Sequence, residues 1–506
     1  MTTENGAISL VSSGDARVDL FSKINRDTPE SILHPLLHLS WSKDPLDTLR
    51  IIFHLRDCRG GKGEREQFYR ALRWLMAFQK SHLEKNLSLI PFYGRFKDFL
   101  IFLSTPLEHQ MLAIYAAQLK IDLALLNTVN AKQISLAAKY APSEGGSFDQ
   151  KHKASTKFAK VLGCNKKNYR TSWLVPLRKQ IDANSILVER RMTDKPEDWE
   201  TIDFSKISSL ALKKYKKAWE RHQRDRYEAY LDSVTSGKSK MNVLRLMPHQ
   251  IVEPYLSGGR IDTTIEAQWI SFVEQTKKTT KFNGALGVVD VSGSMAGTPI
   301  NVAVSLGLLL AELTNGPFHG KFFTFSSSPQ LESVKGSTLY EKVQNMNKSH
   351  WDMSTNIQAV FDTLLSSAKM FGCTDSQMPK TIFIFSDMQF DVACGTNIST
   401  NWHIIKAKYQ EAGYTLPRLV FWNLRGNTVD FPVSATEDNV ALISGFSADL
   451  LKMIIDGDNL NPVDLMLKVI RGQRYSHISL AQIELKETNA KYVEEVNLFD
   501  QGKNGC

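Results

Sequence analysis

The feature that most constrains the fold is an alternation of short apolar runs and amphipathic segments after Phe282. Strand-like and helix-like segments that alternate in this way are typical of a parallel sheet with helices on both faces. Residues 282–475 are therefore predicted to form a doubly wound α/β domain. The apolar runs are ALGVVDV (285–291), KFFTF (321–325), TIFIFSD (381–387), RLVFWNL (418–424) and VALISG (440–445), and the segments between them include PINVAVSLGLLLAEL (299–313), TNIQAVFDTLLSSA (355–368) and HIIKAKYQEAG (403–413).

The preceding residues, 1–281, show a different pattern, in which apolar residues recur at helical spacing. Asp44 and Pro45 supply an N-cap and a first-turn proline, and Gly60 interrupts the helix that follows. Many helices joined by short loops predict an α-helical domain of HEAT-like repeats, although no fixed sequence period is visible. The chain is therefore expected to be multidomain, α followed by α/β, with residues 476–506 as a C-terminal tail.

Charge is distributed unevenly along the 506 residues. Residues 151–226 hold 20 Lys and Arg against nine Asp and Glu, a local net charge of +11. The formal net charge of the whole chain is +9, so the remaining residues sum to −2. One basic segment therefore carries the positive charge, and its natural partners are polyanions.

Membrane, secreted and zinc-binding classes are not indicated. No apolar run approaches the ~18 residues of a membrane span, and MTTENGAISL (1–10) lacks the regions of a signal peptide. We therefore expect no membrane partner. The five cysteines are scattered and form no CxxC pair, so neither a disulfide framework nor a zinc site is expected. We therefore expect the protein in a reducing compartment, which is the cytoplasm or, as an alternative, the nucleus.

Oxygen-bearing side chains stand where the predicted strands reach their carboxyl ends. Asp290 ends the first run and is followed by Ser292 and Ser294. Asp387 ends TIFIFSD, and Thr355 precedes a predicted helix. In an open parallel sheet these loops share one edge. All five residues offer oxygen, which is the ligand type of Mg²⁺ and other hard divalent cations, so we predict a metal site here.

Other chemistries fit this loop less well. A nucleophile elbow needs the pattern G-x-S-x-G, and neither Ser292 nor Ser294 has glycine at both of those places. A phosphatase with an aspartyl nucleophile would have a second acid two residues after Asp290, where Ser292 stands. The remaining alternative is that these side chains only cap the helix that starts near Thr298.

The pattern D-x-S-x-S, with a later threonine and a later aspartate, resembles the metal-ion-dependent adhesion site of von Willebrand factor A domains. The resemblance assigns the metal to the same five residues. In such domains the second loop usually reads Gly-Thr and the third Asp-Gly, whereas Ser354 and Met388 stand at the glycine positions here. The resemblance implies a binding module rather than an enzyme, in which the metal leaves one position for an acidic residue of a protein partner.

Two basic regions are candidates for RNA binding. RDCRGGKGEREQFYRAL (56–72) lacks the glycine and the hydroxyl residue of a Walker loop, so it is either a phosphate-contacting turn or a flexible charged one. QKHKASTKFAKVLGCNKKNYRTSW (150–173) mixes cations with aromatic rings that can stack on unpaired bases, and a solvated helix face is the alternative. The predicted RNA-binding residues are Arg56, Arg59, Lys62, Arg65, Lys157, Lys166, Lys167, Tyr169, Arg170 and Trp173.

A second resemblance covers nearly the whole chain. RDCRGGKGER, YRTSWLVPLRKQIDANSILVERRM and WETIDFSKISSLALKKY, followed by a von Willebrand A domain, resemble a family of unknown function. That family is similar in layout to the Ro/TROVE proteins, in which a ring of helical repeats closed by a von Willebrand A domain binds small or misfolded RNAs. The resemblance implies a non-enzymatic scaffold for RNA and for a protein partner.

Two other functions are kept as alternatives. The first is a protein–protein assembly factor without RNA. The second is a metal-dependent phosphoesterase, for which neither His350 nor His403 is a compelling general base near Asp290. The junction TKKTTKFNG (276–284) is short, so the two domains should touch, and we expect the metal edge to face outward, toward a partner.

Overall fold

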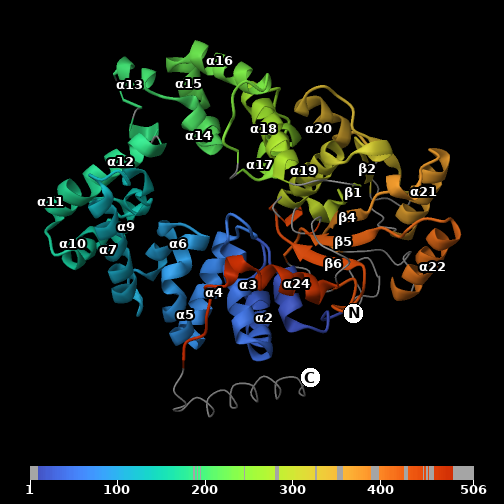
Figure 1. Ribbon diagram of the computed structural model, residues 1–506, viewed down its shortest axis with the longest axis horizontal. Coiled ribbons are helices and arrows are strands. Elements are labelled where there is room, and N and C mark those ends of the chain that lie inside the picture. Colours follow the sequence, from blue (N-terminus) through green and yellow to red (C-terminus); the bar gives the residue numbers. More distant parts are fainter. Residues whose placement is uncertain are drawn as a thin grey trace.

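The elements of the chain follow a closed path (Figure 1). The chain runs through the helices to the sheet, and its C-terminal part then comes back to the first helices. There α24 (Pro462–Ile470) packs against α3 (Pro45–Arg56). The structure is a computed structural model. It describes residues 10–185, 188–190, 192–193, 195–243, 246–279, 284–324, 328–349, 357–388, 398–426, 431–447, 450–451, 454 and 461–482.

The first half is helical, as the spacing of its apolar residues predicts. Asp44 caps α3 by accepting the N–H of Asp47, and Pro45 lies in the first turn. The helices range from three residues in α11 to 18 in α7, so a regular HEAT-like repeat stays a prediction. None of the described helices is long and apolar enough to cross a membrane. They are α1 (Ala16–Lys23), α2 (Glu30–Lys43), α3, α4 (Arg65–Phe78), α5 (Lys80–Asn86), α6 (Ile90–Tyr93), α7 (Glu108–Leu125), α8 (Ala137–Tyr140), α9 (Ser147–His152), α10 (Ala154–Val161), α11 (Lys166–Asn168), α12 (Val175–Ser185), α13 (Pro196–Glu200), α14 (Ser209–Lys214), α15 (Lys216–His222), α16 (Arg224–Thr235), α17 (Pro248–Leu256) and α18 (Thr263–Thr279).

A six-stranded sheet follows, with the strand order β3-β2-β1-β4-β5-β6. Neighbouring strands pair parallel, except that β2 and β3 pair antiparallel. The predicted α/β class, with a mostly parallel sheet, is thus confirmed. The short edge strand β3, LES, was not expected from its composition. The strands are β1 (Ala285–Val289), β2 (Lys321–Thr324), β3 (Leu331–Ser333), β4 (Thr381–Ser386), β5 (Arg418–Asn423) and β6 (Val440–Ser444), and the helices of this half are α19 (Thr298–Leu313), α20 (Leu339–Asn347), α21 (Ile357–Met370), α22 (Ile398–Glu411) and α24.

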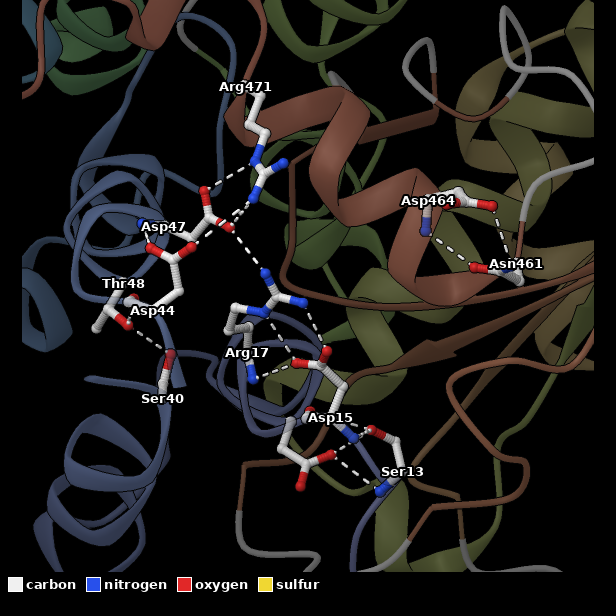
Figure 2. A network of polar contacts seen from close by, with 11 residues as sticks. Ser13, Asp15, Arg17, Ser40, Asp44, Asp47, Thr48, Asn461, Asp464 and Arg471 are labelled. Atoms are coloured by element: carbon white, nitrogen blue, oxygen red, sulfur yellow. Dashed lines mark hydrogen bonds and ion pairs between the residues drawn. The ribbon is translucent and has the colours of Figure 1, made fainter. Parts of the chain in front are cut away.

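The two halves are packed directly against each other near the start and the end of the described chain. Helix α1 contacts β6 and α24, and Leu10 forms an antiparallel bridge with Phe431. Figure 2 shows the polar side of this contact, where the Asp47 carboxylate accepts hydrogen bonds from Arg17 at 2.9 Å and from Arg471 at 2.7 Å. One carboxylate of α3 therefore holds both α1 and the residue that follows α24.

The segment after α24 continues across the helices of the first half. The Tyr475 hydroxyl donates to Asp57 at 3.0 Å, and Arg474 pairs with the same carboxylate. Further on, the Ser479 N–H donates to Asn86 Oδ1 at 3.1 Å. Residues 476–482, where the predicted tail begins, thus lie against α5.

The carboxyl ends of β5 and β6 face the helical half. Gly426, after β5, lies so close to the loop between α1 and α2 that a Cβ would stand 2.2 Å from Asn25 Oδ1. Phe446, after β6, packs its ring 5.6 Å from that of His249 on α17. The expectation that the metal edge faces outward concerns the strand ends after β1 and β4, and it stays a prediction.

Candidate functional site

The loop after β1 brings a carboxylate and two hydroxyls to the carboxyl edge of the sheet. Asp290 is buried, and its Oδ1 accepts the backbone N–H of Ser292 at 2.9 Å. The hydroxyl oxygens of Ser292 and Ser294 lie 3.0 Å apart, in the single turn Gly293–Met295 and the residue before it. Three of the predicted metal ligands therefore share one short turn.

The end of β4 adds a second carboxylate beside the first. Strands β1 and β4 are hydrogen-bonded neighbours with Val289 opposite Phe385, so Asp290 and Asp387 leave the sheet on the same edge. Asp387 is also buried. The Ser386 hydroxyl donates to Asp290 Oδ2 at 2.7 Å and so links the two strand ends. Ser386 was not among the predicted site residues, although its place directly before Asp387 was a signal.

The residue after Asp387 adopts the backbone conformation that glycine favours. Met388 has a φ of 68°, in the left-handed region, and its N–H donates to Ser386 Oγ at 3.2 Å. Holding an L-residue there costs about 1–2 kcal/mol. Met388 therefore holds the left-handed turn at the cost of backbone strain.

The two carboxylates make this edge electronegative. Burial, and then the charge of Asp387, raise the pKa of Asp290 to about 6. Arg425, which follows β5, forms an ion pair with Asp387 at 3.6 Å and is partly exposed. Arg425 was not among the predicted site residues either. The guanidinium offsets part of the negative charge from outside the loop.

Four of the five predicted metal ligands lie in the described residues, at this one edge. Thr355 and His350 lie outside the described residues, as does the side chain of His403. Within the described part of the chain, no group of three or more His, Cys, Asp or Glu side chains comes together as a metal cluster. A metal here would therefore depend on serine hydroxyls as well as on two carboxylates. Such an all-oxygen set fits Mg²⁺ rather than a softer metal.

Lys62, at the centre of the glycine-rich turn between α3 and α4, is buried between the two halves of the protein. Its ammonium donates to the carbonyls of Phe21 and Ile24, the latter at 2.8 Å, and to Ser444 Oγ at the end of β6 at 2.6 Å. Burial lowers the pKa of Lys62 to about 7. This lysine, predicted to contact phosphate, instead joins the turn to the sheet.

The arginines of the same turn divide between the interior and the surface. Arg56 is buried and pairs with Asp98 at 2.8 Å, so its guanidinium is already engaged. Arg59 is exposed, although its Nη1 donates to the Phe92 carbonyl. Arg65 is exposed beside Glu66. Only the last two are placed as a surface phosphate contact requires.

The basic segment exposes its cations more than its aromatic rings. Lys167 and Arg170 are exposed and Lys166 is half-buried. Lys157 is also half-buried and pairs with Glu108 at 2.7 Å. Further exposed lysines that the prediction omitted are Lys151, Lys153, Lys160 and Lys179, three of which lie in the quoted basic stretch.

The two predicted stacking residues are poorly placed for stacking. Tyr169 is buried, and its hydroxyl donates to the Pro142 carbonyl at 3.0 Å. Trp173 is half-buried and packs against the core. Tyr169 therefore cannot stack on an unpaired base in this conformation, because its ring is buried in the core.

The fold and the edge define a class of protein: a helical domain followed by a mostly parallel α/β domain with paired carboxylates at its carboxyl edge. Residues 3–111 and 107–282 match "Domain of unknown function (DUF2828)", and residues 284–494 match "Domain of unknown function (DUF7788)". The chain is also similar to "Uncharacterized protein L728" of Acanthamoeba polyphaga mimivirus, with 33% identity over 506 residues that cover 92% of this chain and 86% of that protein. The chain belongs to the DUF2828 family. Its predicted membership of a family of unknown function is confirmed, while the likeness to von Willebrand A and Ro/TROVE proteins stays a prediction.

Proposed function

We propose that the chain is a non-enzymatic cytoplasmic scaffold with two binding surfaces. The α/β half acts as a von Willebrand A-type domain that holds Mg²⁺ and binds an acidic residue of a protein partner. The helical half binds small structured or misfolded RNA. The observation that carries the proposal is the pair Asp290 and Asp387 at the ends of adjacent strands, with serine hydroxyls beside them.

The electrostatics of the edge support a bound cation. Asp290 and Asp387 are both buried, and the partly exposed Arg425 forms an ion pair with Asp387 at 3.6 Å. A divalent ion stabilises the charged form of both carboxylates and would lower the pKa of Asp290. The hydroxyls of Ser292 and Ser294 supply neutral oxygen donors. Mg²⁺ usually keeps several waters, and a carboxylate of a partner can replace one of them.

Exposed cations on α9 to α12 support RNA binding. Phosphate contacts come from solvent-exposed Lys and Arg, and each contact releases bound counterions from the nucleic acid. Half-buried Trp173 lies in the same region and offers part of a ring. The exposed cations are Lys151, Lys153, Lys160, Lys167, Arg170 and Lys179.

The effect of Mg²⁺ on thermal unfolding tests the metal edge. Mg²⁺ at 100 times its Kd should stabilise the full chain by about 2.7 kcal/mol, since it binds the folded state. Asp290→Asn should abolish the rise in Tm, because it replaces a charged ligand with an amide of the same shape. Asp438→Asn, which changes an exposed carboxylate of the same half, should keep it. The metal site would have to be abandoned if folded Asp290→Asn showed the wild-type Mg²⁺ shift.

The salt dependence of RNA affinity tests the second surface. A structured RNA should bind the full chain with a steep salt slope, and Lys167→Ala with Arg170→Ala should reduce that slope by about 2. Lys369→Ala with Lys468→Ala, two exposed lysines of the α/β half, should leave it unchanged. RNA binding that both double variants leave intact would overturn the assignment to this surface. Absence of RNA binding would favour the assembly factor, and Mg²⁺-dependent phosphoester hydrolysis would favour the phosphoesterase.

A further inference from the structure

A cavity of about 450 Å³ lies where three parts of the chain meet. Its walls come from the first helices with the turn between α3 and α4, from α14 and α17, and from Ser447 after β6. Sites for small molecules commonly measure about 300–1,000 Å³. The side chains that give this cavity its chemistry are Glu64, Arg95, Lys97, Leu210, Met247 and Gln250.

The glycine-rich turn forms one wall of the cavity, and the side chain of its lysine, Lys62, is bound at the sheet instead. The ammonium of Lys62 is held by Ser444 at the end of β6, while the adjacent Gly61 and Gly63 line the cavity. Gly63 has a φ of 71°, which suits glycine, and a Cβ there would stand 3.2 Å from Met247 Cε. The turn can therefore approach the cavity closely without a side chain in the way.

Positive charge at the cavity exceeds what the protein itself neutralises. The guanidinium of Arg56, which lines the cavity, is engaged by Asp98. Arg95 and Lys97 are exposed and make no ion pair within the described part of the chain. These two cations can therefore receive an anionic group without giving up an existing partner.

The cavity also holds a buried acceptor that lacks a hydrogen bond. Glu64 is 2% exposed; its Oε2 lies 3.4 Å from Arg26 Nε, but its Oε1 has no hydrogen-bond partner. An unsatisfied buried polar atom is unfavourable, so a ligand N–H group that reaches this oxygen would be favoured there. Gln250 accepts the Met247 N–H through its Oε1, which leaves its amide N–H bonds as donors.

Apolar side chains complete the set. Leu210 lines the cavity although it is 43% exposed, and Met247 contributes a flexible thioether that packs well against aromatic rings. A ligand for these walls needs an anionic group, a flat apolar face, and an edge that carries both N–H donors and acceptors.

We propose that this cavity binds a nucleotide. Arg95 and Lys97 contact its phosphate, Glu64 accepts an N–H of the base, and Leu210 and Met247 cover the face of the base. The proposal goes beyond the scaffold function, because neither the metal edge nor the surface of α9 to α12 contributes a residue.

Isothermal titration calorimetry of the full chain, without Mg²⁺, tests the proposal with the four ribonucleoside monophosphates. At least one should bind at a single site, and the matching nucleoside should bind at least tenfold more weakly because it lacks the phosphate. Arg95→Ala with Lys97→Ala should weaken nucleotide binding at least tenfold. Glu64→Gln should also weaken it, and Leu210→Trp, a change at an exposed position, should fill the cavity and block binding. Lys167→Ala with Arg170→Ala should have no effect.

A competition experiment distinguishes two sources of the nucleotide, the end of an RNA strand and free nucleotide. A monophosphate that displaces a 5′-phosphorylated RNA oligomer would show that the cavity takes a strand end, and one that does not would show that it takes free nucleotide. Absence of binding by all four monophosphates at millimolar concentration would overturn the proposal, as would affinities that the cavity variants leave unchanged. If RNA binding still depended on Lys167 and Arg170, the scaffold function would survive that failure.

Discussion

Asp57 should hold the segment after α24 against the helices of the first half. Its buried carboxylate accepts a hydrogen bond from Arg474 Nη2 at 2.6 Å, from the Tyr475 hydroxyl at 3.0 Å and from the Arg59 N–H at 3.0 Å. Removing one partner of a fully buried pair costs about 3–5 kcal/mol. Because the Arg474 side chain is 33% exposed, we expect about 2–3 kcal/mol for Asp57→Ala.

The contribution of Asp57 should vanish in acid. Burial alone would raise the pKa of Asp57, but the hydrogen bonds from Arg474 and from the backbone of Arg59 hold it below its ordinary value. A carboxyl with a lowered pKa stabilises the folded state above its ordinary pKa of ~3.9 and loses that effect as the pH falls further. Wild type and Asp57→Ala should therefore differ in stability at pH 7, and this difference should shrink as the pH falls below ~3.9.

Hydrogen exchange at the amides of residues 473–478 measures the free energy of local opening of this segment. Asp57→Ala, Arg474→Met and the double variant form a double-mutant cycle. We expect a coupling energy above about 1 kcal/mol, and Asp438→Asn should leave exchange unchanged. A coupling below about 0.5 kcal/mol, with the single variants still folded, would refute the view that this pair holds the segment in place.

Two further predictions concern the contact between the halves. Because burial lowers the pKa of Lys62 to about 7, the unfolded chain keeps a proton that the folded chain loses, so stability should rise above pH 7 by up to ~1.4 kcal/mol per unit. Urea unfolding at pH 7 and pH 9 should show this rise in wild type and not in Lys62→Met, and identical pH dependence would contradict it. Gly426→Ala should lower Tm, because the added methyl group overpacks against Asn25 at a cost of about 1–3 kcal/mol. Gly293→Ala, where an added Cβ has nothing within 4 Å, should change Tm little. Equal Tm values for the two variants would argue against the close approach of Gly426 to Asn25.

The carboxylate pair at the edge of the sheet could be predicted from the sequence because its components are local. A buried parallel strand needs a continuous apolar run, and the run ends where the carboxyl edge begins, so Asp290 and Asp387 could be placed together without coordinates. Ser386 and Arg425 could not be assigned in the same way. Their roles depend on which strands become neighbours and on how the loop after β5 is directed.

The sequence by itself determined the helical first half, the mostly parallel sheet and the residues at its carboxyl ends, because periodicity and turn chemistry act over a few residues. Only the tertiary structure decided the roles of the cations in the glycine-rich turn. Lys62 binds Ser444, 382 residues away, and Asp57 binds Arg474, 417 residues away. A charged run has the same local pattern whether its side chains face water or the interior. Burial of a charge is decided by the partners that packing brings to it, and those partners lie at the other end of the chain.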